Sequence, residues 1–216
     1  MSETHSRLLD APTVPLVARP RRATLVVMAV ALLVVYVAML ATGSDVSYDA
    51  SLSDIVHSYD QSRGAMQLAA YVGMVFVGLL LFFGAALRNA LRVSAESWLA
   101  DVTLLGFVAL AATLGSWIVT DVAMWKAVDY GDESAIRTIA VISDAGFLPL
   151  MASMIAVYLG TGLAGLLTGA LPRWLAITSI AIGILAPLGP LGFVGATLLP
   201  IWLVATAVTV RLTPTP

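Results

Sequence analysis

The sequence predicts an all-α fold, namely a polytopic transmembrane helical bundle of about six spans. The first observation is the composition: 60% of the 216 residues are hydrophobic, 11% are charged, and the mean hydropathy is +0.96. A soluble domain carries about 25% charged residues, so a surface this poor in charge suits lipid. The second observation is that the charges leave long uncharged stretches, at residues 23–44, 64–87, 102–120, 145–172 and 174–210.

These uncharged stretches set the expected number of spans. An ionisable group at the bilayer centre costs at least a few kcal/mol, and a helix needs about 20 residues to cross the hydrocarbon core. The first four stretches are long enough for one crossing each, and the fifth is long enough for two. We therefore expect spans at about 23–43, 64–87, 99–121, 145–168, 172–188 and 191–210.

The segment before the first span, 1–22, is predicted to be a disordered cytoplasmic tail, because it is interrupted by prolines and lacks apolar periodicity. The apolar run that follows is longer than the core of a secretory signal peptide, and its cleavage pattern is poor. We therefore expect an uncleaved first span. A short second cytoplasmic tail is expected at 212–216.

Outer loops are expected at 44–63 and 122–144. The first contains DIVHSYDQSRG, which is able to start a helix capped by Ser51 or Ser53. Positions three apart in a helix fan His57 and its neighbouring acids over about 120° of the surface, so these side chains do not converge on a metal ion. We expect a polar helix that leads into the second span at the water boundary. A ligand-binding or gating segment is the alternative.

The last uncharged stretch is expected to fold into two spans that turn at APLGPLG, residues 186–192. Its prolines remove backbone donors and its glycines allow a tight reversal. The fifth span is short and is expected to begin at Pro172, a favoured first helical residue; a re-entrant segment is the alternative. Pro149 and Pro200 lie inside the fourth and sixth spans and are expected to kink them.

The basic residues predict the orientation. With six spans, both chain ends lie on one side, which holds eight of the Lys and Arg residues, and the other side holds three. The positive-inside rule then places the N and C termini in the cytoplasm of a bacterial cell, in its inner membrane. Most acidic residues fall on the opposite side, so the outer face is expected to be acidic.

Five charged residues map to the outer membrane border although they come from different loops and helix ends. They are Asp60, Arg63, Asp121, Arg137 and Asp144. We expect them to pair and hold helix ends together; a polar pocket that roofs the bundle is the alternative. Arg63 and Asp144 are the first candidates, because each adjoins a long span, where an unpaired charge is costly.

Three segments carry a family resemblance. HSYDQSRGAMQLAAYVGMVFVGLLLFFGAALRNALR has Tyr59 and Arg63 at its outer end, ISDAGFLPLMASMIAVYLGTGLA contains Asp144 and Pro149, and TGALPRWLAI contains residues 172–174. These segments resemble the second span, the fourth span and the following loop of a large family of uncharacterised multi-span bacterial integral membrane proteins, common in actinobacteria. The resemblance implies the topology, and the family has no established activity to carry over.

Several chemistries are disfavoured. The chain has no cysteine, so thiolate metal sites and a cysteine nucleophile are excluded. Its pI near 5.5 and the lack of a basic face argue against nucleic-acid binding. His5 and His57 lie outside the spans, which argues against haem held by paired histidines. No cofactor or metal site is expected. Asp101, in the first turn of the third span, suits the helix dipole.

We expect an integral membrane protein without enzymatic activity, which scaffolds or regulates a membrane-protein partner or a homo-oligomer in the lipid bilayer. The alternative is a small transporter or binding protein for an apolar or amphipathic compound, with a cavity between the kinked fourth and sixth spans. An enzyme that acts on lipid is the third hypothesis, and it needs an acid/base pair at one interface. Only Asp101 with Arg92, or Asp60 with His57, offer such a pair.

Overall fold

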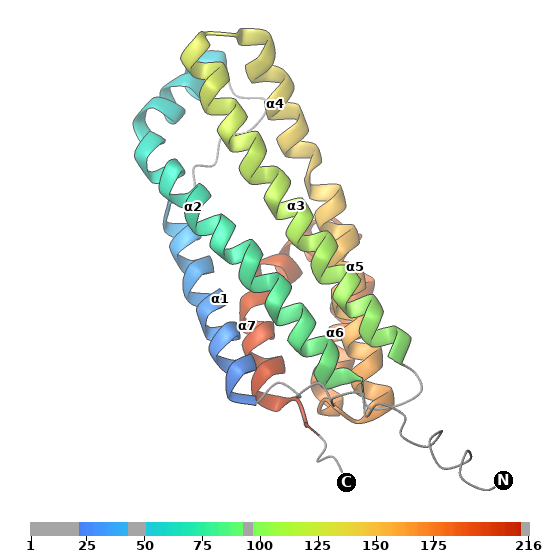
Figure 1. Cartoon of the computed structure of the whole chain (residues 1–216). Helices are drawn as coiled ribbons and strands as arrows, with labels where there is room; N and C mark the ends of the chain where they lie inside the picture. Colours follow the sequence, from blue (N-terminus) through green and yellow to red (C-terminus); the bar gives the residue numbers. More distant parts are fainter. Residues whose placement is uncertain (1–21, 43–50, 93–96, 213–216) are drawn as a thin grey trace, which may run out of the picture.

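The computed structural model describes residues 22–42, 51–92 and 97–212, and in this part of the chain every regular element is an α-helix. The predicted tails, up to residue 21 and from 213, and residues 43–50 of the first predicted loop lie outside the described residues. The seven helices (Figure 1) are α1 (Arg22–Thr42), α2 (Leu52–Leu91), α3 (Ser97–Tyr130), α4 (Glu133–Ala145), α5 (Phe147–Thr168), α6 (Arg173–Leu185) and α7 (Pro190–Thr209).

The predicted all-α membrane bundle is confirmed. Five stretches of helix are long and apolar enough to cross a membrane, namely α1, α2, α3, the consecutive helices α4 and α5, and α7. Large apolar side chains also cover the outside of the bundle: Phe82 is 71% exposed, Val119 68% and Leu148 72%. Large apolar side chains are exposed on every one of the long helices, so lipid is the solvent that suits this exterior.

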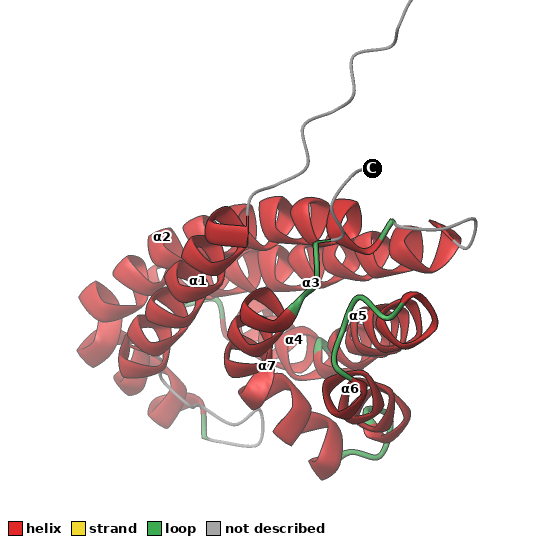
Figure 2. Ribbon diagram, turned by 90° about the horizontal axis from the view of Figure 1, so that it is seen from below, coloured by secondary structure: helices red, strands yellow, loops and turns green. Residues whose placement is uncertain are grey.

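The helices form a bundle in which α3 lies between α2 and α5 (Figure 2). α1 packs on α2 and α7, and α6 packs on α5. α1 begins and α7 ends at the same end of the bundle, which we call the terminal end (Figure 1). At the other end, α2, α3 and α4 extend beyond the remaining helices and form what we call the headpiece, residues 52–66, 122–130 and 133–145.

The headpiece has a small apolar core of its own, made by Ile55, Met124, Ala127 and Ile136. The expected outer loops 44–63 and 122–144 are therefore helical in most of their described residues. In the first of them, the polar helix expected to lead into the second span, with Ser51 or Ser53 as its cap, is confirmed as the start of α2. The second is helical because three segments, from α2, α3 and α4, cover one another's apolar residues.

The two helices that begin in the headpiece, α2 and α4, each start at a side-chain cap. The Oγ of Ser51 accepts a hydrogen bond from the amide of Asp54 at 3.2 Å, which caps α2. At the start of α4, Oδ1 of Asp132 accepts hydrogen bonds from the amides of Ala135 and Ser134, both at 3.1 Å. The Ala135 amide and the Ser134 hydroxyl, which also donates to Asp132, hold the pKa of this carboxyl below its usual range.

Pro149 explains the boundary between α4 and α5. A proline ring clashes with the carbonyl four residues earlier, and here that carbonyl belongs to Ala145, the last residue of α4. Gly146 joins the two helices, and the indole nitrogen of Trp117 occupies the space that a Cβ at Gly146 would need. The kink expected inside the fourth span is thus a junction between two helices. Trp117 of α3 packs against this junction.

Among the described residues, α6 is the apolar helix that is too short to be counted as a span. Its 13 residues extend about 20 Å, which is less than the hydrocarbon thickness of about 30 Å. The chain reverses between Leu185 and Pro190, inside the predicted turn, with Gly189 at φ 56°. Exposed Leu188 follows α6, so this turn presents an apolar surface.

Glycines bring α3 and α5 into backbone contact. A Cβ added at Gly106 would lie 2.7 Å from the backbone nitrogen of Val157, and one at Gly160 would lie 2.8 Å from Oγ1 of Thr103. Small residues that permit such close approach are typical of helix packing in membranes. Gly115 of α3, by contrast, faces open space.

Candidate functional site

The five charged residues predicted to cluster do not pair with one another: in the part of the chain that the structure describes, no ion pair joins any two of them. Arg63 instead pairs with Asp129, so that α2 is joined to the end of α3. Asp129 was not among the predicted partners, because the sequence does not show that α3 continues as a helix past residue 121. The expected partner of Arg63, Asp144, is exposed on α4.

Within the described residues, the remaining members of the predicted cluster form no ion pair with one another. Asp60 and Arg137 are exposed on α2 and α4. Asp121 is exposed on α3 and lines a cavity. The structure therefore supports neither a pinned five-residue network nor a common polar pocket, and it singles out Asp121.

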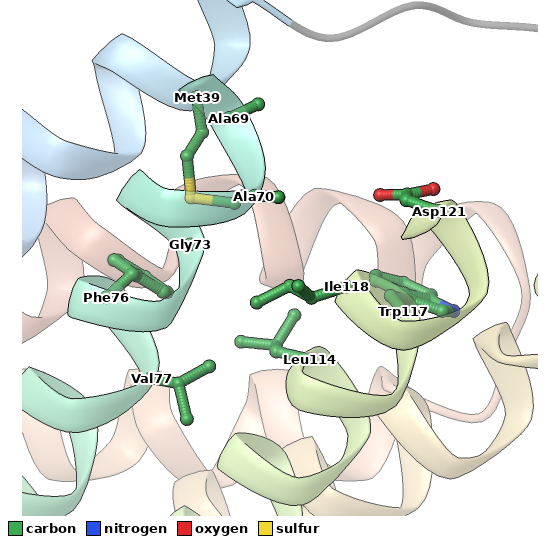
Figure 3. Close-up of a pocket in the computed structure, with 10 residues that line it drawn as sticks. All are labelled: Met39, Ala69, Ala70, Gly73, Phe76, Val77, Leu114, Trp117, Ile118 and Asp121. Carbon is green, nitrogen blue, oxygen red and sulfur yellow. The ribbon is translucent and has the colours of Figure 1, made fainter. Parts of the chain in front are cut away.

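The cavity beside Asp121 lies between α1, α2 and α3 and has a volume of about 160 Å³ (Figure 3). Its wall is apolar apart from that carboxylate, with Met39 from α1, Phe76 from α2, and Leu114 and Ile118 from α3. We call it the Asp121 cavity. A small apolar space with one charged group at its edge is a typical arrangement for a site that orients an amphipathic ligand.

A second cavity of about 150 Å³ adjoins the first and shares Met39, Phe76, Leu114 and Trp117 with it. It extends to α5 and α7, and we call it the Tyr36 cavity. Tyr36, which lines it, shares a side-chain hydrogen bond with Thr197 of α7. The alternative hypothesis expected a cavity between the fourth and sixth spans, and this cavity touches both, although α1, α2 and α3 supply most of its wall.

Trp117 and Asp121 are one helical turn apart on α3. Residues four apart lie on the same helix face, and in Figure 3 the indole ring of Trp117 lies one turn below the carboxylate, at the wall of the cavity. The spacing is visible in the sequence. What the sequence does not show is that this face of α3 borders a space rather than a neighbouring helix.

The terminal end of the bundle has its own ion pair. Nε of Arg88 on α2 lies 2.5 Å from Oδ1 of Asp101 on α3, and the two side chains are 27% and 43% exposed. The catalytic pairs considered from the sequence are not formed: Asp101 binds Arg88 rather than Arg92, and His57 hydrogen-bonds with Gln61 at 2.9 Å. Within the described residues, no three His, Asp or Glu side chains form a group able to hold a metal ion.

A polar network crosses the other half of the bundle. The hydroxyl of Tyr158 on α5 donates to the carbonyl of Gly195 on α7 at 2.9 Å. Nε1 of Trp202 on α7 donates to Oγ of Ser179 on α6 at 2.8 Å, and the Tyr158 and Trp202 rings lie 4.6 Å apart. Each of these polar groups has a hydrogen-bond partner inside an apolar core. They therefore hold helices together and do not provide an unpaired group for catalysis.

Comparison with models of protein families, with curated proteins and with solved structures finds no match to this chain. The resemblance to the actinobacterial membrane-protein family stays a prediction. The function is therefore argued from the two cavities and the headpiece.

Proposed function

We propose that the chain is a multi-pass membrane protein that binds an apolar or amphipathic small molecule in the adjoining Asp121 and Tyr36 cavities, as a binding protein or small transporter rather than an enzyme. The observation that carries the proposal is the pair of apolar spaces, with shared wall residues, between α1, α2, α3 and α7. Each is close to the roughly 150 Å³ of an apolar cavity that admits benzene. A close-packed bundle with a purely structural role has no need of such spaces.

Cavity filling tests this proposal. Ala70 is buried at the wall of the Asp121 cavity, so Ala70→Leu is expected to fill that space. We expect benzyl alcohol, a neutral probe with an aromatic body, to raise the melting temperature of the wild type and to raise that of the variant less, because only the Tyr36 cavity stays open in it. Ala85→Leu is the control, because Ala85 is exposed on the same helix. Equal shifts in all three proteins indicate that the probe acts through the detergent or lipid.

Regulation or scaffolding of a membrane-protein partner is the second candidate, and the headpiece favours it. Its core of Ile55, Met124, Ala127 and Ile136 holds a folded unit beyond the remaining helices, where a partner has access to it. Gentle purification followed by native mass spectrometry tests this candidate. A stoichiometric protein partner, released when the exposed polar surface of α4 is altered, supports it over the small-molecule function.

The proposed location is the bacterial inner membrane, with the terminal end in the cytoplasm and the headpiece outside. The excess of basic residues near the terminal end supports this orientation. Because the chain lacks cysteine, single-cysteine variants report the topology directly. A membrane-impermeant maleimide is expected to label Ser134→Cys, in the headpiece, in intact cells and to label Arg92→Cys only after lysis. The opposite pattern reverses the orientation.

A further inference from the structure

The carboxylate of Asp121 is not neutralised by the protein. Within the described residues, no side chain forms an ion pair with it and no hydrogen bond to it is seen. Its electrostatic neighbour is the phenol of Tyr59, which carries no positive charge. The two arginines that extend toward α3 are already engaged, Arg63 with Asp129 and Arg88 with Asp101.

Among the residues that the structure describes, the rest of the cavity wall carries no charge. Every other lining residue is apolar or aromatic, from Met39 on α1 to Ile118 on α3. The site therefore combines one negative charge with an apolar interior, and a positively charged ligand with an apolar body complements both features. An anionic or purely polar ligand complements neither.

The depth of Asp121 fits the head of such a ligand. The helical path from Asp101 to Asp121 on α3 is about 30 Å, which equals the thickness of the hydrocarbon core. If Asp101 lies at one border, Asp121 lies at the other. An amphipathic molecule placed here has its charged head at the water boundary and its apolar part below, among Phe76 and Leu114.

Trp117 adds a second recognition element for a cation. Its ring lines the cavity one turn below the carboxylate (Figure 3). The face of an indole ring attracts a cation within about 6 Å, and a carboxylate forms its strongest hydrogen bonds with a charged donor. An ammonium group between the two is stabilised by both, whereas a neutral group of the same shape loses most of this stabilisation.

We propose that the Asp121 cavity is a binding site for a small organic cation, a primary ammonium compound with a compact apolar body, whose charged head lies against Asp121 and Trp117. The inference rests on the proposed function, because it names the ligand class of the same cavity. The size limits the body to about one aromatic ring or a short alkyl chain, since a cavity of this volume admits benzene.

The test compares benzylammonium with benzyl alcohol, which has the same number of non-hydrogen atoms and no charge. Dissociation constants are measured by calorimetric titration into the full chain in nanodiscs of neutral phosphatidylcholine, with empty nanodiscs subtracted. We expect benzylammonium to bind the wild type at least tenfold more tightly than benzyl alcohol. Asp121→Asn is expected to abolish this preference while it leaves the affinity for benzyl alcohol within about twofold, because it removes the charge and keeps the shape.

Asp144→Asn is the matched control, because it removes the same charge from an exposed α4 position outside the cavity. It is expected to keep the tenfold preference. If both probes bind equally to the wild type and to Asp121→Asn, the cation inference is overturned and the cavity function stands. If Asp144→Asn loses the preference as well, the effect is one of general surface charge, which also overturns the inference. If neither probe binds the wild type, the inference and the proposed function both fail.

Discussion

Arg88 of α2 and Asp101 of α3 form an ion pair at the terminal end. At the other end of the same two helices, Arg63 and Asp129 form a second pair. The helical path from Arg63 to Arg88 is about 38 Å, a little more than the hydrocarbon thickness of about 30 Å. The two pairs therefore bracket the membrane-spanning part of α2 and join it to α3 at both ends.

The pair at the terminal end is expected to contribute measurably to stability. Arg88 is only 27% exposed, and partly buried pairs are less screened than surface pairs. In a double-mutant cycle with Arg88→Ala and Asp101→Ala, we expect each single change to lower the free energy of unfolding and the coupling energy to be about 1 kcal/mol. Equilibrium unfolding in mixed micelles gives the values. Strict additivity contradicts a direct pair.

The pair at the headpiece end is expected to be weaker. Arg63 and Asp129 are 45% and 48% exposed, so their coupling energy is expected to stay below about 0.5 kcal/mol and to fall as salt is added. The same cycle with Arg63 and Asp144 is the control. It is expected to give no coupling, and coupling there would restore the partner expected from the sequence.

The hydrogen bond from Trp202 to Ser179 is expected to hold α6 against α7. Trp202→Phe keeps an aromatic ring and removes the donor, and single interhelical hydrogen bonds in membranes contribute about 0.6 kcal/mol on average. Because the smaller ring also leaves a void, we expect a loss of about 1 kcal/mol or more in unfolding free energy. Trp174→Phe is the control, since Trp174 is 59% exposed. Equal effects from the two changes exclude a specific role of the hydrogen bond.

Gly106 is expected to be intolerant of even one methyl group. A Cβ there meets the backbone of α5 at 2.7 Å, and a backbone atom moves only if the whole helix shifts. Gly106→Ala is expected to separate α3 from α5 and cost about 1–3 kcal/mol. Gly78→Ala, where a Cβ meets nothing within 4 Å, is expected to be neutral or slightly stabilising. Thermal unfolding of the two variants side by side decides between specific packing and a general effect of alanine.

The Asp132 cap is expected to make headpiece stability depend on pH. The folded pKa of Asp132 is lowered by the Ala135 amide and the Ser134 hydroxyl, so the charged carboxylate stabilises the fold above the unfolded pKa of about 3.9. This contribution is lost as the pH falls through the folded pKa.

The measurement is the difference in melting temperature between the wild type and Asp132→Ala across the acid range. We expect the wild type to be more stable near neutral pH and the difference to shrink below about pH 4. Asp132→Asn keeps the acceptor without the charge, and its difference is expected to vary less with pH. A wild-type advantage over Asp132→Ala that stays constant into strong acid argues against the charged cap.

The charge-free stretches predicted the membrane helices because the free-energy cost of a charge in lipid applies to every residue in the hydrocarbon core. α1, α5 and α7 begin and end within two residues of the expected 23–43, 145–168 and 191–210. The same rule does not apply outside the hydrocarbon, and there the expected loops are helices. Their apolar stripes depend on three segments that are distant in sequence and meet in the headpiece.

The candidate site was only partly predictable. Asp121 was among the expected border charges, but its role depends on which helix faces stay apart, and that follows from packing. The pairing of Arg63 with Asp129 depends on the register of α2 against α3. That register is set in turn by close contacts such as Phe107 at Gly84, which charge patterns do not report.

α2 runs without a break from the terminal end into the headpiece, over 40 residues and about 60 Å. Such a helix joins its membrane-spanning part to its headpiece part without a hinge. The wall of the Asp121 cavity includes several α2 residues, from Ala69 to Val77, which follow the headpiece part of this helix closely in sequence. No break in the helix separates the cavity wall from the headpiece, so both belong to one continuous helix that crosses the boundary between lipid and water.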